Sequence, residues 1–316
     1  MRNPPRVRTA LAALGALAGL TLFPAVSLEP APSATAATSS PGYWLEASDG
    51  GVFSFNTHFY GSALSPTNPC RATTPNGACY SMAATKDGGG YWLLVASSGK
   101  VLTFGDAVSY GQPADTPAYQ GPGDFWPQST QIVPTSTGKG YWVLETGLSG
   151  LGSVQGFGDA KTFGDEVTTA HQTGHAGWPV ALVGTADDQG YWIVDNDGGV
   201  FSFGDAVFYG SMGGHPLSAP VLAAAGTPDR RGYWLAGSDG GVFSFGDAHF
   251  GGSVAGFKLA APVIAMAANP SGPGYWLAAV DGGVFALGGA PFLGSMGGVP
   301  LDRPVYSMVA TANGAG

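Results

Sequence analysis

The sequence predicts an all-β fold, a six-bladed β-propeller closed by pairing of the C-terminal strand with the first blade. Three observations carry this prediction. The tripeptide Gly-Tyr-Trp occurs six times, and its tyrosines are spaced by 48, 50, 50, 42 and 42 residues. Each unit contains short apolar runs between glycine-rich turns, which is typical of a four-stranded blade, and lacks the period of about 3.6 residues that marks a helix. The two ends of the chain also carry complementary parts of one repeat.

The N-terminal segment 1–36 has the features of a cleaved secretory signal peptide. Three arginines precede an apolar run from Leu11 to Val26, and a small-residue cleavage sequence follows at 33–37. The alternative is a membrane anchor, but two glycines and a proline interrupt the run. We therefore expect export, a short linker at 37–41, the propeller at 42–316, and a protein that is extracellular or associated with the cell wall.

The composition limits the possible partners. The chain is 44% hydrophobic and 12% aromatic, which suits a sizeable core, but only 10% of its residues are charged and its formal net charge is −9 at pH 7. Nucleic acids and anionic membranes need clusters of Lys and Arg, and the sequence has none. We expect a monomer that binds neither nucleic acid nor, after signal cleavage, a membrane.

The repeat unit is clearest between 220 and 253. Its small-residue segment Val221–Gly226 is predicted to be the innermost strand, because the blades crowd the propeller axis there. The second strand is Tyr233–Gly237, in which adjacent Tyr and Trp point to opposite faces, so both faces must be buried. A turn containing Asp-Gly leads to the third strand, Val242–Phe245. The fourth, His249–Gly252, is short, which limits the exposed sheet edge.

The chain ends predict how the ring closes. The first Gly-Tyr-Trp, at 42–44, follows no innermost strand, whereas Val305–Thr311 matches Cys79–Thr85, the segment that precedes a later Gly-Tyr-Trp. The C-terminal segment is therefore expected to complete the first blade and to leave no unpaired edge there.

The segment Asp239–Ala248, DGGVFSFGDA, together with the Gly-Tyr-Trp-Leu that precedes it, resembles the repeats of secreted actinobacterial β-propeller proteins of unassigned function. It is similar, more loosely, to RCC1-type propeller repeats. The resemblance extends from 42 to 311 and implies a propeller architecture, but it implies no activity. The chromatin and GTPase functions of RCC1-type proteins are intracellular and do not transfer to an exported acidic chain.

Both cysteines, Cys70 and Cys79, lie in one loop of the exported part. Disulfides form in oxidising compartments, and the Cys-x8-Cys spacing alone does not specify a metal site. The sequence therefore predicts a local disulfide.

Aspartates recur in the turns of the repeat. The turn between the second and third strands carries Asp49, Asp197, Asp239 and Asp281. Because a turn is needed in every blade and an active site is not, we interpret these residues as structural. The stretch Asp195-Asn196-Asp197-Gly198 opens like a calcium loop but lacks the downstream glutamate, which leaves calcium as an alternative. We expect no metal and no other cofactor.

Insertions depart from the repeat at 62–80, 111–131, 145–155 and 165–180, all on one face of the predicted disc. They contain the candidate binding residues Trp126, Trp178, His171 and His175. The two tryptophans could stack on a sugar or anchor a protein, or they could instead plug the axial pore. The two histidines, four residues apart, would chelate a metal on a helix, but their polar surroundings favour a solvated loop.

The sequence contains no recognisable catalytic motif, and we assign no catalytic residue. The leading hypothesis is a non-catalytic extracellular module that binds or scaffolds a carbohydrate or protein ligand. An alternative is a secreted hydrolase or lyase with catalytic carboxylates on the insertions. Its candidate residues are Asp115, Asp124, Asp165 and Glu166. A purely structural surface protein is a third possibility.

Overall fold

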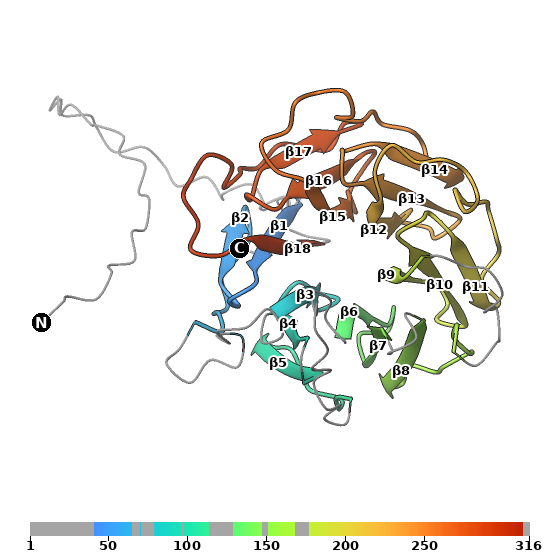
Figure 1. Cartoon of the computed structure of the whole chain (residues 1–316). Coiled ribbons are helices and arrows are strands. Elements are labelled where there is room, and N and C mark those ends of the chain that lie inside the picture. Colours follow the sequence, from blue (N-terminus) through green and yellow to red (C-terminus); the bar gives the residue numbers. More distant parts are fainter. Residues whose placement is uncertain are drawn as a thin grey trace, which may run out of the picture. The chain divides into compact units, whose positions relative to one another are not determined.

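The computed structural model describes residues 41–64, 70, 79–96, 98–113, 129–146, 151–167 and 177–311. These residues lie in one compact unit, Ser39–Gly316. They form six antiparallel sheets of three strands each and contain no helix, so the predicted all-β, propeller-like repeat is confirmed (Figure 1). No helix that could span a membrane occurs among them. The predicted signal peptide lies outside the described residues.

Each sheet has an inner, a middle and an outer strand (Figure 1). The inner strands are β3 (Cys79–Ala84), β6 (Ser129–Pro134), β9 (Pro179–Gly184), β12 (Val221–Gly226), β15 (Val263–Ala268) and β18 (Val305–Thr311). The middle strands are β1 (Gly42–Ala47), β4 (Gly90–Val95), β7 (Gly140–Thr146), β10 (Gly190–Asp195), β13 (Gly232–Gly237) and β16 (Tyr275–Ala279). The outer strands are β2 (Val52–Phe55), β5 (Lys100–Gly105), β8 (Gly152–Gly158), β11 (Val200–Gly204), β14 (Val242–Gly246) and β17 (Val284–Leu287).

The Tyr-Trp pair of each middle strand forms the core between neighbouring sheets. All twelve rings are at most 4% exposed, because adjacent strand residues point to opposite faces and both faces of the middle strand are covered. Each tryptophan packs against the tyrosine of the next sheet, with ring centroids 5.1–5.9 Å apart. The series includes Trp276 of the last middle strand and Tyr43 of the first.

The predicted fourth strand is wrong. The segment His249–Gly252 is irregular, as are the described segments that follow the other outer strands. Its carbonyl groups accept hydrogen bonds from side chains instead of from a neighbouring strand: Trp234 Nε1 donates to His249 O (2.9 Å) and Tyr275 Oη to Gly252 O (2.5 Å). The same two bonds recur in all six repeats. The tryptophan ties the segment to its own sheet and the tyrosine ties it to the next.

The C-terminal strand β18 belongs to the sheet of the first repeat. It pairs with β1 in an antiparallel register from Gly42↔Thr311 to Ala47↔Val305, and Gly42 N donates to Thr311 Oγ1 (3.0 Å). As the inner strand of its sheet, β18 also lies beside β3 and β15, the inner strands of the adjacent sheets (Figure 1). On the outer side, Tyr43 Oη donates to Gly294 O of the last repeat (2.5 Å).

Every sheet has one β-bulge at the same place. The second residue of each inner strand has no partner in the middle strand, so the register shifts by one residue. The bulged residues are Tyr80, Thr130, Val180, Leu222, Ile264 and Tyr306. A bulge bends a strand locally, so all six sheets are bent at the end where the inner strands begin.

Candidate functional site

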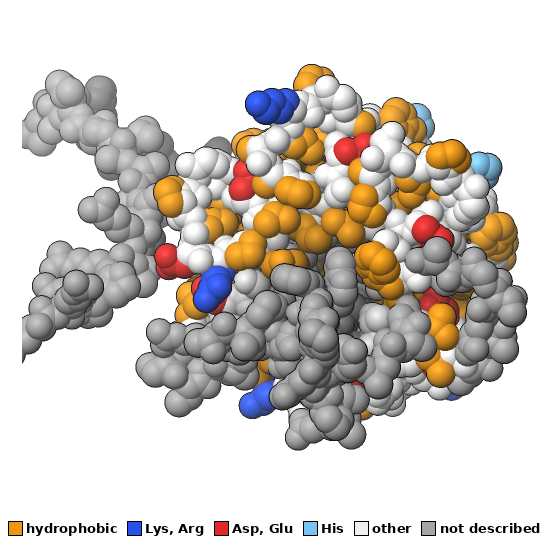
Figure 2. Space-filling view, in the orientation of Figure 1, with side chains coloured by type: hydrophobic (Ala, Val, Ile, Leu, Met, Phe, Trp, Pro, Cys, Tyr) orange, Lys and Arg blue, Asp and Glu red, His pale blue; other side chains and the backbone are white. Residues whose placement is uncertain are grey.

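The four insertions depart from the end of the sheets where the inner strands begin, which we call the insert end. Here the segment that leaves each outer strand meets the turn between the middle and outer strands. For example, Ala63 N donates to Gly50 O (2.9 Å), Glu166 N to Gly152 O (3.1 Å) and Met212 N to Gly198 O (2.8 Å). On the described part of the face shown in Figure 2, Lys and Arg side chains are sparse and separated.

The structure describes one of the four candidate binding residues. Trp178 is half-buried at the insert end, immediately before β9. Its backbone exchanges two hydrogen bonds with the turn of the same sheet: Trp178 N donates to Asn196 Oδ1 (2.9 Å), and Asn196 N donates to Trp178 O (3.0 Å). Trp126, His171 and His175 lie outside the described residues, as do Asp115 and Asp124.

The repeated turn aspartates make the same contact in each of their four turns. Asp49, Asp197, Asp239 and Asp281 each accept a hydrogen bond at Oδ1 from the backbone N–H two residues later, at 2.8–3.0 Å. This is the bond by which Asp stabilises a turn. Among the described residues, no group of three or more His, Cys, Asp and Glu side chains could hold a metal ion.

The predicted disulfide is present. Cys70 and Cys79 are bonded, with their Cα atoms 5.2 Å apart, and both are buried against the first two sheets. The bridge ties Cys70, within the first insertion, to Cys79 at the start of β3.

Two carboxyl groups meet in the interior between the third and fourth sheets. Glu166 is 1% exposed and Asp195 is 0% exposed. Glu166 Oε2 accepts a hydrogen bond from Gly152 N (2.7 Å), and its carboxyl lies within hydrogen-bonding reach of the Asp195 carboxyl. Burial raises the pKa of Asp195 to about 7, and the nearby charge of Asp197 acts in the same direction, while the bond with Glu166 lowers it. The Asp195 carboxyl therefore stays protonated well above the pH at which an exposed aspartate ionises.

The other repeats show that this acid pair replaces small or apolar residues. The position of Glu166, defined by its N–H bond to the turn glycine, is occupied elsewhere by Ala63, Met212, Val254 and Met296. The position of Asp195, defined by pairing with the first residue of the inner strand, is occupied by Ala47, Val95, Gly237 and Ala279, and by Glu145 in the third sheet. At the junction of the third and fourth sheets both positions are therefore acidic, although the same frame packs elsewhere without such a pair.

Two further buried acids lie at the insert end. Glu46 is 0% exposed in β1, its oxygens have no hydrogen-bond partner among the described residues, and burial together with the charge of Asp49 raises its pKa well above the usual range. Glu145 is 7% exposed and accepts a hydrogen bond from Gln155 Nε2 (2.5 Å). All buried acidic side chains of the described chain therefore belong to the first four repeats, which carry the insertions, and none to the last two.

From the sequence, Glu166 is a catalytic candidate and Asp195 is part of a calcium-loop alternative, but nothing in the sequence predicts that they meet. Glu46 and Glu145 were not among the predicted site residues. Aligning the six residues that begin at each Gly-Tyr-Trp would have shown Glu145 and Asp195 at a position that is otherwise Ala, Val or Gly.

No protein-family model matches the chain, and no curated protein matches it.

Proposed function

We propose that the protein is a secreted, non-catalytic β-propeller that binds a carbohydrate or protein ligand at the insert end of its first four repeats. The proposed frame is a closed ring of six blades in which β18 completes the first blade. The β18–β1 pairing and the bond from Tyr43 to Gly294 support this closure. The signal-like segment 1–36, the disulfide and the resemblance to secreted actinobacterial repeats support export.

One observation carries the binding proposal: buried carboxyl groups replace apolar residues only in the repeats that carry insertions. Burial of a carboxyl group removes it from water at a cost in free energy, so packing of the frame alone does not account for four buried acids. They adjoin the stems of the insertions. Glu166 holds the turn at Gly152, and Asp195 begins the turn whose next residue, Asn196, holds the backbone of Trp178.

A glycan array combined with a pull-down from the producing cell envelope tests the proposal. Binding of the captured ligand is then compared for the wild type, Trp126→Ala and Trp178→Ala. Each substitution is expected to weaken binding by about 1–2 kcal/mol or more, since aromatic side chains are frequent energetic anchors, with little effect on melting temperature. Phe250→Ala, which removes an exposed ring from the fifth repeat, is the control. Normal binding by both tryptophan variants would place the ligand elsewhere.

The acid pair favours one second candidate, a hydrolase. A carboxyl with a pKa of about 7 beside another carboxyl suits a general acid at neutral pH. In this alternative, opening of the insert end exposes Glu166 and Asp195 to substrate. Hydrolysis of fluorogenic glycosides that Glu166→Gln and Asp195→Asn both abolish, with folding intact, would establish it. Absence of turnover with a ligand bound at the insert end supports the non-catalytic module.

A further inference from the structure

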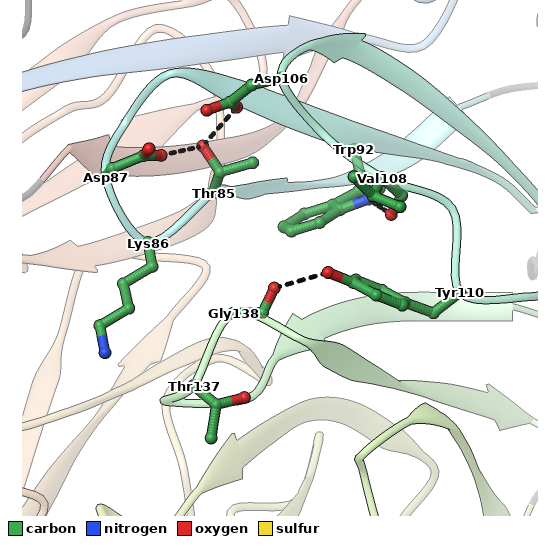
Figure 3. Close-up of a pocket in the computed structure, with 9 residues that line it drawn as sticks. All are labelled: Thr85, Lys86, Asp87, Trp92, Asp106, Val108, Tyr110, Thr137 and Gly138. Carbon is green, nitrogen blue, oxygen red and sulfur yellow. Dashed lines mark hydrogen bonds between the residues drawn. The ribbon is translucent and has the colours of Figure 1, made fainter.

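The end of the sheets opposite the insert end carries a pocket of about 470 Å³ between the second and third sheets (Figure 3). Lys86 and Asp87 come from the turn between β3 and β4, and Thr137 and Gly138 come from the corresponding turn of the next sheet. Trp92 and Tyr110 lie between the two turns. All of these residues are described, and none belongs to the insertions.

The neighbouring junctions explain why the pocket is open here. Gly138 is the fourth residue of its turn, and the residues in that position in the next two sheets are Asp188 and Arg230, as the same turn hydrogen bond shows. Asp188 reaches across to the preceding sheet, where it accepts hydrogen bonds from Ser136 N (2.8 Å) and Ser136 Oγ (2.7 Å). Between the second and third sheets, Lys86 occupies the position of Ser136 and Gly138 occupies the position of Asp188. Glycine has no side chain, so the hydrogen-bonded bridge of the next junction is missing here.

In the fifth sheet the turn position of Gly138 holds a long side chain, that of Arg230. Arg230 extends over the end of β12, where a Cβ added at Gly226 would lie 2.6 Å from Arg230 Nη1. Burial lowers the pKa of this guanidinium, and the charge of Asp188 acts against that change. The Arg230 side chain thus lies against the end of its own inner strand, a contact that Gly138 cannot make.

The walls of the pocket combine apolar surface with hydrogen-bonding groups of both kinds. Trp92 and Val108 supply apolar atoms, and the indole N–H of Trp92 is already donated to Val108 O (2.9 Å). The N–H of Gly89 and the hydroxyl of Thr85 lower the pKa of Asp87, so this exposed carboxylate is an ionised acceptor. Lys86 is exposed, and its ammonium makes no ion pair among the described residues.

We propose that this pocket binds one pyranose ring of an extracellular glycan. A sugar ring presents C–H groups that suit the surface of Trp92 and Val108, and its hydroxyl groups both donate and accept hydrogen bonds. Asp87 accepts and Lys86 donates, whereas the Thr137 hydroxyl already donates to Asp159 Oδ2 (2.6 Å) and is left only as an acceptor. The volume lies in the lower part of the range for small-molecule sites, which matches one ring, and the exposed walls leave room for the chain to continue. The proposal uses no residue of the insert end.

The test closes the pocket with a pair of residues taken from the next junction. Lys86→Ser with Gly138→Asp recreates Ser136 and Asp188. Aspartate is compatible with this backbone, because Asp188 has a φ of 59° where Gly138 has a φ of 74°. Lys86→Ser alone is the control, since it removes the cation and leaves the cavity open. Binding of glucose, N-acetylglucosamine and glucuronate to the mature secreted protein is measured by saturation-transfer NMR.

We expect at least one of these sugars to bind the wild type, the double variant to weaken binding about tenfold or more, and Lys86→Ser to have an intermediate effect, with melting temperatures unchanged. No binding to the wild type at about 10 mM sugar, or equal binding to the double variant, would overturn the proposal. Ligand binding at the insert end should survive the double substitution, so this experiment fails or succeeds independently of the proposed function.

Discussion

At the residue scale, the feature that most distinguishes this chain from a uniform repeat protein is the buried acid pair of Glu166 and Asp195. Burial raises the pKa of Asp195 from 3.8 to about 7, so the folded protein binds the Asp195 proton more tightly than the unfolded chain. The resulting contribution to stability is fully present below about pH 4, where the carboxyl is protonated in both states. It is lost as the pH rises through about 7.

The free energy of unfolding is therefore expected to fall between pH 4 and pH 8, by at most about 4 kcal/mol from this group. Asp195→Asn with Glu166→Gln keeps the shape and the hydrogen bonding but removes the titration. Chemical denaturation at several pH values should give a flatter profile for this variant. Parallel profiles for the two proteins would show that Asp195 does not hold the proton.

At the element scale, each irregular segment after an outer strand is held by one tryptophan and one tyrosine rather than by a β-ladder. Trp234 is 4% exposed and donates to the segment of its own repeat, while Tyr275 reaches the same segment from the next repeat. The segment therefore couples neighbouring sheets.

Removing the tryptophan should be far more costly than removing the hydroxyl. Trp234→Ala is expected to destabilise the protein by about 3–5 kcal/mol, because it leaves a large cavity. Tyr275→Phe should cost about 1 kcal/mol, the contribution of a typical hydrogen bond. Phe250→Ala, at a ring that is 53% exposed on the same segment, should change stability by about 0.5 kcal/mol or less. Similar losses for all three would contradict the coupling role of the Tyr-Trp pair.

The disulfide acts on the same scale. Peptide mapping of the mature protein should give one fragment linked through Cys70 and Cys79, and replacement of both residues by Ser should lower the unfolding free energy by at most about 2–3 kcal/mol, because the closed loop is short. Free thiols in the secreted protein would contradict this prediction.

At the scale of the whole molecule, the repeat made the sheets predictable, because the spacing of Gly-Tyr-Trp and the turn residues are local signals. The predicted strand Val221–Gly226 coincides with β12. The irregular conformation of the segment predicted as a fourth strand could not be foreseen, because the side chains that donate to its carbonyl groups come partly from the next repeat. The acid pair was not predictable either, since Glu166 and Asp195 meet only when two sheets pack. The pocket was not predictable either, because it is open only where Gly138 has no side chain to bridge the two sheets.

Closure of the proposed ring gives a prediction at this scale. Deleting 304–316 removes β18, which exposes the edge of β1 and the faces of its neighbours, so the truncated protein should aggregate or fold poorly. Size-exclusion chromatography and thermal melting measure this. An unchanged melting temperature and a monomeric elution volume would exclude closure by this strand.

If ligand binding depends on the insert end, conversion of one junction to its neighbour should abolish or weaken it. Glu166→Met with Asp195→Gly installs the Met212 and Gly237 pair of the next junction, which is compatible with the same frame. Binding of the ligand captured from the cell envelope is measured by titration calorimetry. We expect a folded protein whose affinity falls about tenfold or more. A folded variant with unchanged affinity would contradict it.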